Sequence, residues 1–412
     1  MRPTLSKAPR CRGLFARGLR AALAGLSLLA AACAQTGSGS GGGAGGATGQ
    51  GPAVPPVPPV DVTRSVDLAL LLPRTVENEG VSRLAAAISN AARLAIADVN
   101  DPVLVLREYD TAGQPERAVA AAEQAVAEGA DLILGPFFGA STRAVAPVAG
   151  AAGLRVISFS TDLGAAGGPV YVSGYTPEAE ARRILGYAAR QGLRRIGVFR
   201  AQTAYGDAAA AAAGRAAADF GLAIQASLAY EPSFVGIEAA SGPFAEEARA
   251  FEVDAVLLPA GGRELQATGS FLNFRGIDPQ NVQYLGLGQW QSRASFDEPA
   301  LQGGWFPAPD PVAASRFSAR YAERYGERTA PLAALGYDAV AVAAQLVATA
   351  RVTGSTAPFT DAAITRPQGF RGALGQLRFT PDGGVERETA ILEVGNRRFV
   401  VREPSQLAAP GS

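Results

Sequence analysis

The sequence of 412 residues has no histidine, one methionine (Met1), two cysteines (Cys11 and Cys33) and one lysine, Lys7. Without histidine, the chain cannot build a Ser–His or Cys–His catalytic pair or a histidine-ligated metal centre. A lysine confined to residue 7 excludes Schiff-base chemistry and a phosphate-binding-loop lysine from the body of the protein. No pair of carboxylates is marked as an acid and base either. We therefore expect a protein that is not an enzyme and needs no metal or cofactor.

The first 32 residues have the composition of an export signal. Six basic residues and no acidic residue accompany an apolar run from Ala21 to Ala30. About a dozen apolar residues are too few to span a bilayer as a helix, which needs ~20, and the pattern is typical of a cleaved secretory signal. Its removal leaves 31 basic and 37 acidic residues, a net charge of −6. This balance argues against nucleic acid or anionic lipid as the main partner.

Cys33 ends the segment Leu29-Ala-Ala-Ala-Cys33, which resembles a bacterial lipobox. The resemblance implies that the thiol of Cys33 is lipidated and that Cys33 becomes the mature N-terminus. No other cysteine follows Cys11, so Cys33 cannot form a disulfide within the mature chain. Ala34 rather than aspartate comes next, which by enteric-type sorting implies the outer membrane. An ordinary signal peptide cut near Ala32 is the alternative.

Residues 34–60 have the composition of a tether between the membrane and a folded domain. They contain nine glycines, five prolines and no charged residue. The glycine-rich part favours flexible coil, and Val54–Val60 favours extended polyproline II. We therefore expect a signal peptide over residues 1–32, a lipidated tether over 33–64 and a folded body from residue 65.

Short apolar segments then alternate with helical periodicity in two series. The first series has expected strands at 66–72, 103–106, 132–134 and 156–159, with helices through Asn100, at 115–129 and at 141–153. The second has strands at 195–199, 223–230, 255–258 and 283–285, with helices at 177–191, 204–220, 244–251 and 264–274. Fully apolar strands that alternate with helices indicate parallel sheets covered on both faces. Long helices at 312–325 and 332–353 and short strands over 370–401 follow. The pattern predicts two α/β lobes and a cleft.

In the first lobe, the candidate cleft residues follow expected strands, because ligands of open α/β sheets bind beyond the carboxyl ends of the strands. Phe137 and Ser141 lie in one such loop, where a helix N-terminus favours an anion such as a ligand carboxylate. Capping of its own helix by Ser141 is the alternative. Ser160 and Thr161 supply hydroxyls in the next loop, although ordinary turns use the same residue types. Tyr175 joins the two series.

In the second lobe, Tyr205, Gly261, Gln289 and Trp290 follow expected strands. Gly261 allows close backbone approach and Trp290 offers an aromatic wall; a turn glycine and a packed tryptophan are the alternatives. The segment 286–288 lacks the third glycine of a dinucleotide fingerprint, and 98–101 lacks the glycine and glutamate of a calcium loop. We therefore expect a small polar ligand, if any, and no cofactor.

Five segments occur in the order found in type I periplasmic binding proteins of the leucine-binding kind. They are Val66–Leu72, Gly135-Pro136, Ile157-Ser158, Tyr205-Gly206 and Gly336–Ala339. The chain resembles this family over about residues 65–403. The resemblance implies a two-lobed α/β fold with two parallel sheets flanked by helices and three interlobe crossings, expected near residues 173, 306 and 367. Lobe one is then 65–173 plus 307–366, lobe two is 174–306 plus 367–403, and 404–412 is a tail.

Within this family, the sequence looks closer to lipoprotein activators of penicillin-binding proteins than to soluble amino-acid receptors. The similar segments are Leu134–Phe138, Tyr284–Trp290 and Phe370–Phe379. This resemblance implies a non-enzymatic lipoprotein, anchored to the outer membrane in the periplasm, that activates or regulates a penicillin-binding protein (a peptidoglycan synthase). The alternative is a lipid-anchored substrate-binding protein that delivers an amino acid or another small polar solute to an ABC permease.

Two departures from the receptor pattern concern the ligand. Gly139 stands where receptors carry a ligand-binding serine, and the neutral Gln289 occupies the loop of an acidic residue that holds an ammonium group. Ser160 and Thr161 still match the hydroxyls that hold a ligand carboxylate. The departures argue against an amino-acid ligand. The discriminating feature is whether the cleft offers complementary groups from both lobes or is filled by its own aromatic side chains.

Overall fold

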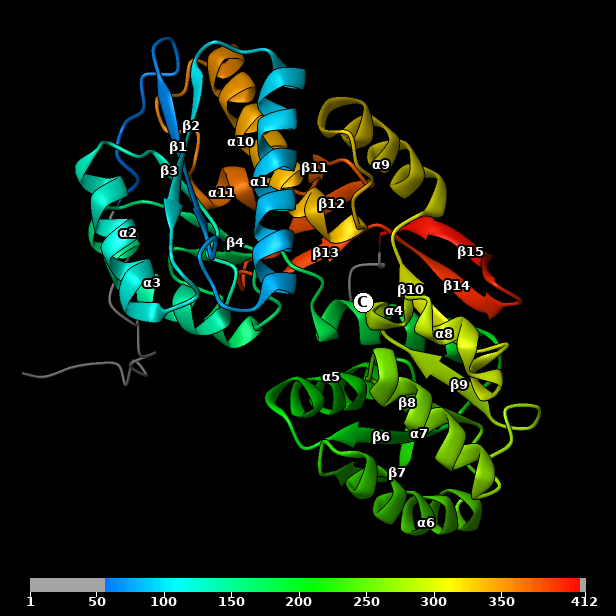
Figure 1. Cartoon of the computed structure of the whole chain (residues 1–412). Coiled ribbons are helices and arrows are strands. Elements are labelled where there is room, and N and C mark those ends of the chain that lie inside the picture. Colours follow the sequence, from blue (N-terminus) through cyan, green and yellow to red (C-terminus); the bar gives the residue numbers. More distant parts are fainter. Residues whose placement is uncertain (1–55, 408–412) are drawn as a thin grey trace, which may run out of the picture. The chain divides into compact units, whose positions relative to one another are not determined.

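The computed structural model describes residues 56–407, which form two α/β lobes and a small antiparallel sheet (Figure 1). The first sheet has the strand order β2-β1-β3-β4-β5, and the second has the order β15-β14-β10-β9-β8-β6-β7. Cys33 and its lipobox lie outside the described residues. The expected α/β fold with helix-flanked sheets is confirmed. The second sheet is mixed rather than purely parallel, because β14 runs antiparallel to its neighbours β10 and β15.

The first lobe alternates parallel strands and helices. Its strands are β1 Val66–Leu72, β2 Leu104–Asp110, β3 Leu132–Leu134, β4 Val156–Ser158 and β5 Val170–Val172. Its helices include α1 Glu79–Val99, α2 Pro115–Ala127 and α3 Gly139–Ala151. Strand β2 continues four residues beyond the expected Leu106. The sequence does not indicate this extension, because the second half of the strand is only partly buried and mixes charged with apolar residues.

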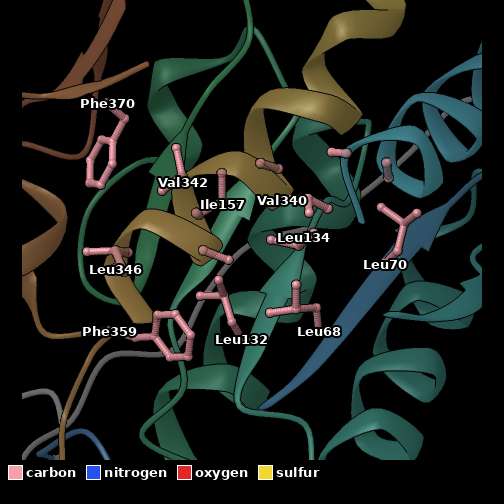
Figure 2. Close-up of a cluster of buried hydrophobic side chains, with 14 of the residues drawn as sticks. Leu68, Leu70, Leu132, Leu134, Ile157, Val340, Val342, Leu346, Phe359 and Phe370 are labelled. Atoms are coloured by element: carbon pink, nitrogen blue, oxygen red, sulfur yellow. The ribbon is translucent and has the colours of Figure 1, made fainter. Parts of the chain in front are cut away.

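Every residue of β1 is buried because helices cover both faces of the sheet. Leu68 and Leu70 share one core cluster with residues of α1 and of α10 (Ala334–Thr353), as Figure 2 shows. Ala69 and Leu71 point to the other face and share a second cluster with α2 and α3. Successive side chains of a strand point to opposite faces, so an unbroken apolar strand fits this doubly covered position.

The second lobe repeats this design. Its strands are β6 Arg195–Ala201, β7 Ala223–Tyr230, β8 Ala255–Leu258, β9 Gln283–Gly286, β10 Trp305–Ala308, β14 Thr389–Gly395 and β15 Arg398–Gln406. The main helices are α4 Pro177–Arg190, α5 Ala204–Asp219, α6 Phe234–Ala250 and α7 Gly262–Phe274. Helix α6 starts ten residues before the expected Phe244, because Ser233 caps it by accepting the N–H of Gly236 and the helix accommodates Pro243.

The segment between β10 and β14 returns to the first lobe. It contains α9 Pro311–Tyr325, α10, α11 Asp361–Ile364, β11 Phe370–Arg371, β12 Gln376–Phe379 and β13 Val385–Arg387. Phe370 and Phe379 pack in the same core cluster as Leu68, and the chain enters the second sheet only at Thr389. The crossing expected near residue 367 therefore lies near 388. Short alternating strands do not reveal which lobe their buried face contacts.

Helix α10 is part of a segment, Pro331–Thr353, that is long and apolar enough to cross a membrane, but 67% of its most apolar window is buried inside the fold. Such burial is typical of a core helix. The residues before β1 also pack against this helix. Val60 and Val62 are buried in the first-lobe core, and the backbone N–H of Val60 donates to the carbonyl of Thr356 over 2.7 Å. Residues 57–64, expected in the tether, thus belong to the domain.

Candidate functional site

The loop after β3 positions two of the predicted site residues. Phe137 is half-buried and meets Phe138 edge to face, with ring centroids 5.2 Å apart. Phe138 occupies the N-cap position of α3 and offers no side-chain cap. Ser141 lies inside the helix, so it is not the cap; it is buried, and its Oγ has no hydrogen-bond partner among the described residues. The start of α3 therefore keeps uncapped N–H groups, which favour an anion.

The carboxylate of Asp162 packs directly on this helix start. A Cβ atom added to Gly139, the first residue of α3, would lie 2.5 Å from Asp162 Oδ2. Asp162 also forms an ion pair with Arg143 and accepts the N–H of Gly164 over 2.9 Å. Gly139 thus makes room for the protein's own carboxylate beside the helix N-terminus.

The hydroxyls of the loop after β4 differ in their availability. Ser160 is buried, and its Oγ accepts the backbone N–H of Asp162 over 2.9 Å. Ser158 Oγ lies 2.8 Å from Thr142 Oγ1 and stays within the core. Thr161 is exposed. Of the two predicted hydroxyl groups, Ser160 already stabilises its own turn, while Thr161 is free to reach solvent.

Trp290 is not a wall of the cleft, which corrects the sequence prediction. Its indole is fully buried in the second-lobe core, where Nε1–H donates to the carbonyl of Leu258 over 3.0 Å. Gly286 and Gly304 make room for it, because a Cβ at Gly286 would come within 2.2 Å of the ring. Gly261 lies with its backbone beside the exposed Gln289, since a Cβ atom added to this glycine would lie 3.1 Å from the Cβ of Gln289.

The buried carboxyl of Glu180 was not predicted from the sequence. It lies in the first turn of α4, is 6% exposed, and accepts the backbone N–H of Gly288. Desolvation raises the pKa of Glu180 to about 8. Burial also raises the pKa of the half-buried Tyr205, and the charge of Glu180 adds to that shift. Two acids in a first helical turn look like ordinary helix-dipole partners, so no sequence signal distinguishes Glu180 from its neighbour Glu178.

Two of the chain segments that cross between the lobes, at Ser173–Tyr175 and at Arg387, meet through the Arg387 side chain. Its guanidinium bonds Asp338 over 2.7 Å and the carbonyl of Ser173 over 2.8 Å, and lies 5.0 Å from the ring centre of Tyr175. Tyr175, Glu180 and Arg387 line a cavity of about 10 Å³, enough for about one water molecule. Tyr175, a predicted site residue, therefore lies in a closely packed crossing region.

The comparisons with known proteins agree on one fold. The family model described as periplasmic binding protein matches residues 65–398. The fold is similar to an ABC transporter substrate-binding protein from Sphaerobacter thermophilus, with 17% identity, a TM-score of 0.67 and coverage of 82% of this chain and 97% of that one. A second similar structure, a putative branched-chain amino acid ABC transporter from Rhodospirillum rubrum, has 19% identity and a TM-score of 0.66, and the match covers 82% of this chain and 99% of that one. The leucine binding protein LivK from Thermotoga maritima has 20% identity and a TM-score of 0.59, and the match covers 82% of this chain and 97% of that one. No curated protein matches the sequence.

Proposed function

This chain belongs to the periplasmic binding protein family, and on that premise we propose that it regulates a penicillin-binding protein, a peptidoglycan synthase, through protein contact. In this proposal it is a non-enzymatic lipoprotein, anchored through Cys33 to the outer membrane on its periplasmic side. Family membership implies the periplasmic location, and the leucine-binding-protein-like fold supplies the two lobes.

The observation that carries the proposal is the position of Asp162. Its carboxylate packs on Gly139 and pairs with Arg143, beside the helix terminus where the family pattern would hold a ligand carboxylate. A second carboxylate there would meet the like charge of Asp162, which opposes its binding. The protein's own side chain thus fills the place of the ligand's anionic group.

The second lobe supports the same conclusion for the cationic end of an amino acid. Gln289 carries no charge, and Glu180 holds its proton at neutral pH because burial raises its pKa to about 8. Glu180 is also enclosed, with a cavity of about 10 Å³ beside it. An ammonium group therefore finds no ionised partner at these positions, and a role through protein contact fits this geometry better than amino-acid capture.

A substrate-binding protein of an ABC transporter is the second candidate. The observation that favours it is the likeness of the fold to solved proteins that are named as parts of ABC transporters. In that case the ligand would be one that needs neither a vacant anion site nor an ionised acid in the second lobe, such as a neutral polar solute.

In-cell crosslinking of the tagged full-length protein, followed by mass spectrometry, tests the proposal. We expect enrichment of a bifunctional peptidoglycan synthase from cells that carry the wild-type chain. Cys33→Ser, which removes the lipidated thiol, is expected to reduce that enrichment by releasing the protein from the membrane. Enrichment of an ABC permease in place of a synthase would overturn the proposal in favour of the second candidate.

A further inference from the structure

A pocket of about 410 Å³ lies where α10 ends and α11 begins. This volume falls within the ~300–1,000 Å³ typical of small-molecule sites. Its apolar lining comes from Leu346 and Ala350 of α10, Ala357 and Pro358 of the following loop, and Ala363 of α11. Such a lining favours an apolar chain rather than a fully polar solute.

The pocket is separate from the strand-end loops described above. Arg351, at the end of α10, donates to the carbonyl of Val62, which precedes β1. Asp361 of α11 accepts hydrogen bonds from Arg155, which precedes β4. The pocket therefore lies at the amino ends of the first-lobe strands, whereas Asp162 follows the carboxyl end of β4. Binding here would not depend on the cleft or on the function proposed for it.

Arg366 is the single charged side chain in the lining. Its guanidinium stacks on Phe370 at 4.1 Å, and its Nε–H donates to the carbonyl of Gly369 over 2.8 Å. Nη1 donates to Thr349 Oγ1 over 3.2 Å and Nη2 to Gln345 Oε1 over 3.5 Å. All these partners are uncharged, and no carboxylate between residues 56 and 407 lies within ion-pair distance of Arg366.

A guanidinium has five N–H donors, so each terminal nitrogen of Arg366 keeps one that these bonds do not use. Two N–H donors on one planar guanidinium suit the two oxygens of a carboxylate. Stacking on Phe370 and the bond to Gly369 hold the plane in place. Burial lowers the pKa of Arg366 through desolvation, and an anionic partner would offset this cost.

We propose that this pocket binds a small amphiphilic carboxylate, with its apolar chain against Leu346 and Ala350 and its carboxylate on the terminal nitrogens of Arg366. A medium-chain fatty acid represents this chemical class. The charge of Arg366 selects the anionic head group, and the apolar lining selects the chain.

Calorimetric titration of octanoate into the purified full-length protein tests this proposal. We expect saturable binding at one site, and binding of 1-octanol weaker by about tenfold or more because it lacks the charge. Arg366→Gln should weaken octanoate binding by a similar factor. The control Arg83→Gln removes an exposed arginine of α1 that forms no ion pair with the described residues, and it should leave binding unchanged.

A second variant separates loss of the site from loss of the fold. Thr353→Phe places a ring at the exposed rim of the pocket and leaves Arg366 intact, so it should also reduce octanoate binding while preserving the thermal transition. Arg182→Met, in the other lobe, should bind octanoate like the wild type. Absence of saturable octanoate binding by the wild type, equal binding of octanol, or unchanged binding by both Arg366→Gln and Thr353→Phe would overturn the proposal.

Discussion

At the scale of single residues, the carboxyl group of Glu180 is enclosed and forms no ion pair with the described residues. Glu180 accepts the N–H of Gly288, and desolvation is the main cause of its raised pKa. The native state thus keeps a proton that the unfolded chain releases near its ordinary value. Between the pKa of the unfolded chain and that of the native state, the two states bind different numbers of protons, so the stability of the protein depends on pH in that range.

Glu180→Gln is predicted to remove this dependence. The pKa rises from 4.5 in the unfolded chain to about 8 in the folded one, so the wild type keeps its full stability below pH 4.5 and loses part of it as pH rises to 8. The loss across that window is on the order of 3–5 kcal/mol for a fully enclosed group. Urea unfolding at several pH values measures it. An equal decline in Glu180→Gln would show that Glu180 is not its source.

Asp162 and Trp290 show which features of the site a local sequence pattern does not predict. The loop holding Ser160, Thr161 and Asp162 can be identified because polar residues follow an apolar strand. Asp162 turns back onto Gly139 because the two loops lie close together in the fold. A local sequence pattern does not predict this distance between loops. Trp290 shows the converse, since its place in the core rests on two distant glycines that make room for the indole.

At the scale of elements, close contacts fix how β9 and β10 pack with the segment that holds Trp290. Gly286→Ala at the end of β9 is predicted to destabilise the protein by about 1–3 kcal/mol, because the new methyl group would overlap the buried ring. The matched change Gly214→Ala in α5 meets no atom within 4 Å and should stabilise the protein by about 0.5–1 kcal/mol. Chemical denaturation of both variants checks the opposite signs, and two changes of the same sign would refute the packing argument.

The ion pair between β13 and α10 joins the small antiparallel sheet to the first lobe. Both side chains are almost fully buried, and Arg387 Nη1 lies 2.7 Å from Asp338 Oδ2. Arg387→Met leaves a buried carboxylate without its cation and should cost about 3–5 kcal/mol. Arg387→Met combined with Asp338→Leu should recover most of that loss. Denaturation of the single and double variants measures both values.

A solvent-exposed pair provides the control for this experiment. Arg182 and Asp219 form an ion pair between α4 and α5 that is far more accessible to water. Arg182→Met should therefore change the free energy of unfolding by about 1 kcal/mol or less. A loss at Arg182 as large as that at Arg387 would contradict the assigned role of burial.

At the scale of the whole molecule, the sequence is sufficient to predict the family and the two α/β lobes. Alternation of apolar strands with helices defines the sheets, since each pattern repeats over many residues. It does not define the third crossing, because β11, β12 and β13 are short and only their packing against α10 assigns them to the first lobe. The sequence likewise does not predict that Val60 and Val62 are buried in the core, because they lie in or next to a proline-rich segment that resembles a tether.

In the function proposed for the whole molecule, its own Asp162 takes the place of a ligand carboxylate. Calorimetric titration of leucine into the full-length protein measures whether Asp162 blocks that place. Asp162→Ala is the comparison, and Asp219→Ala, which loses another surface ion pair, is the control. We predict no saturable leucine binding by the wild type or by Asp219→Ala, and measurable binding by Asp162→Ala once it is combined with Gln289→Glu, which supplies an ionised partner for the ammonium group. Tight leucine binding by the wild type, unchanged in Asp162→Ala, would contradict the account.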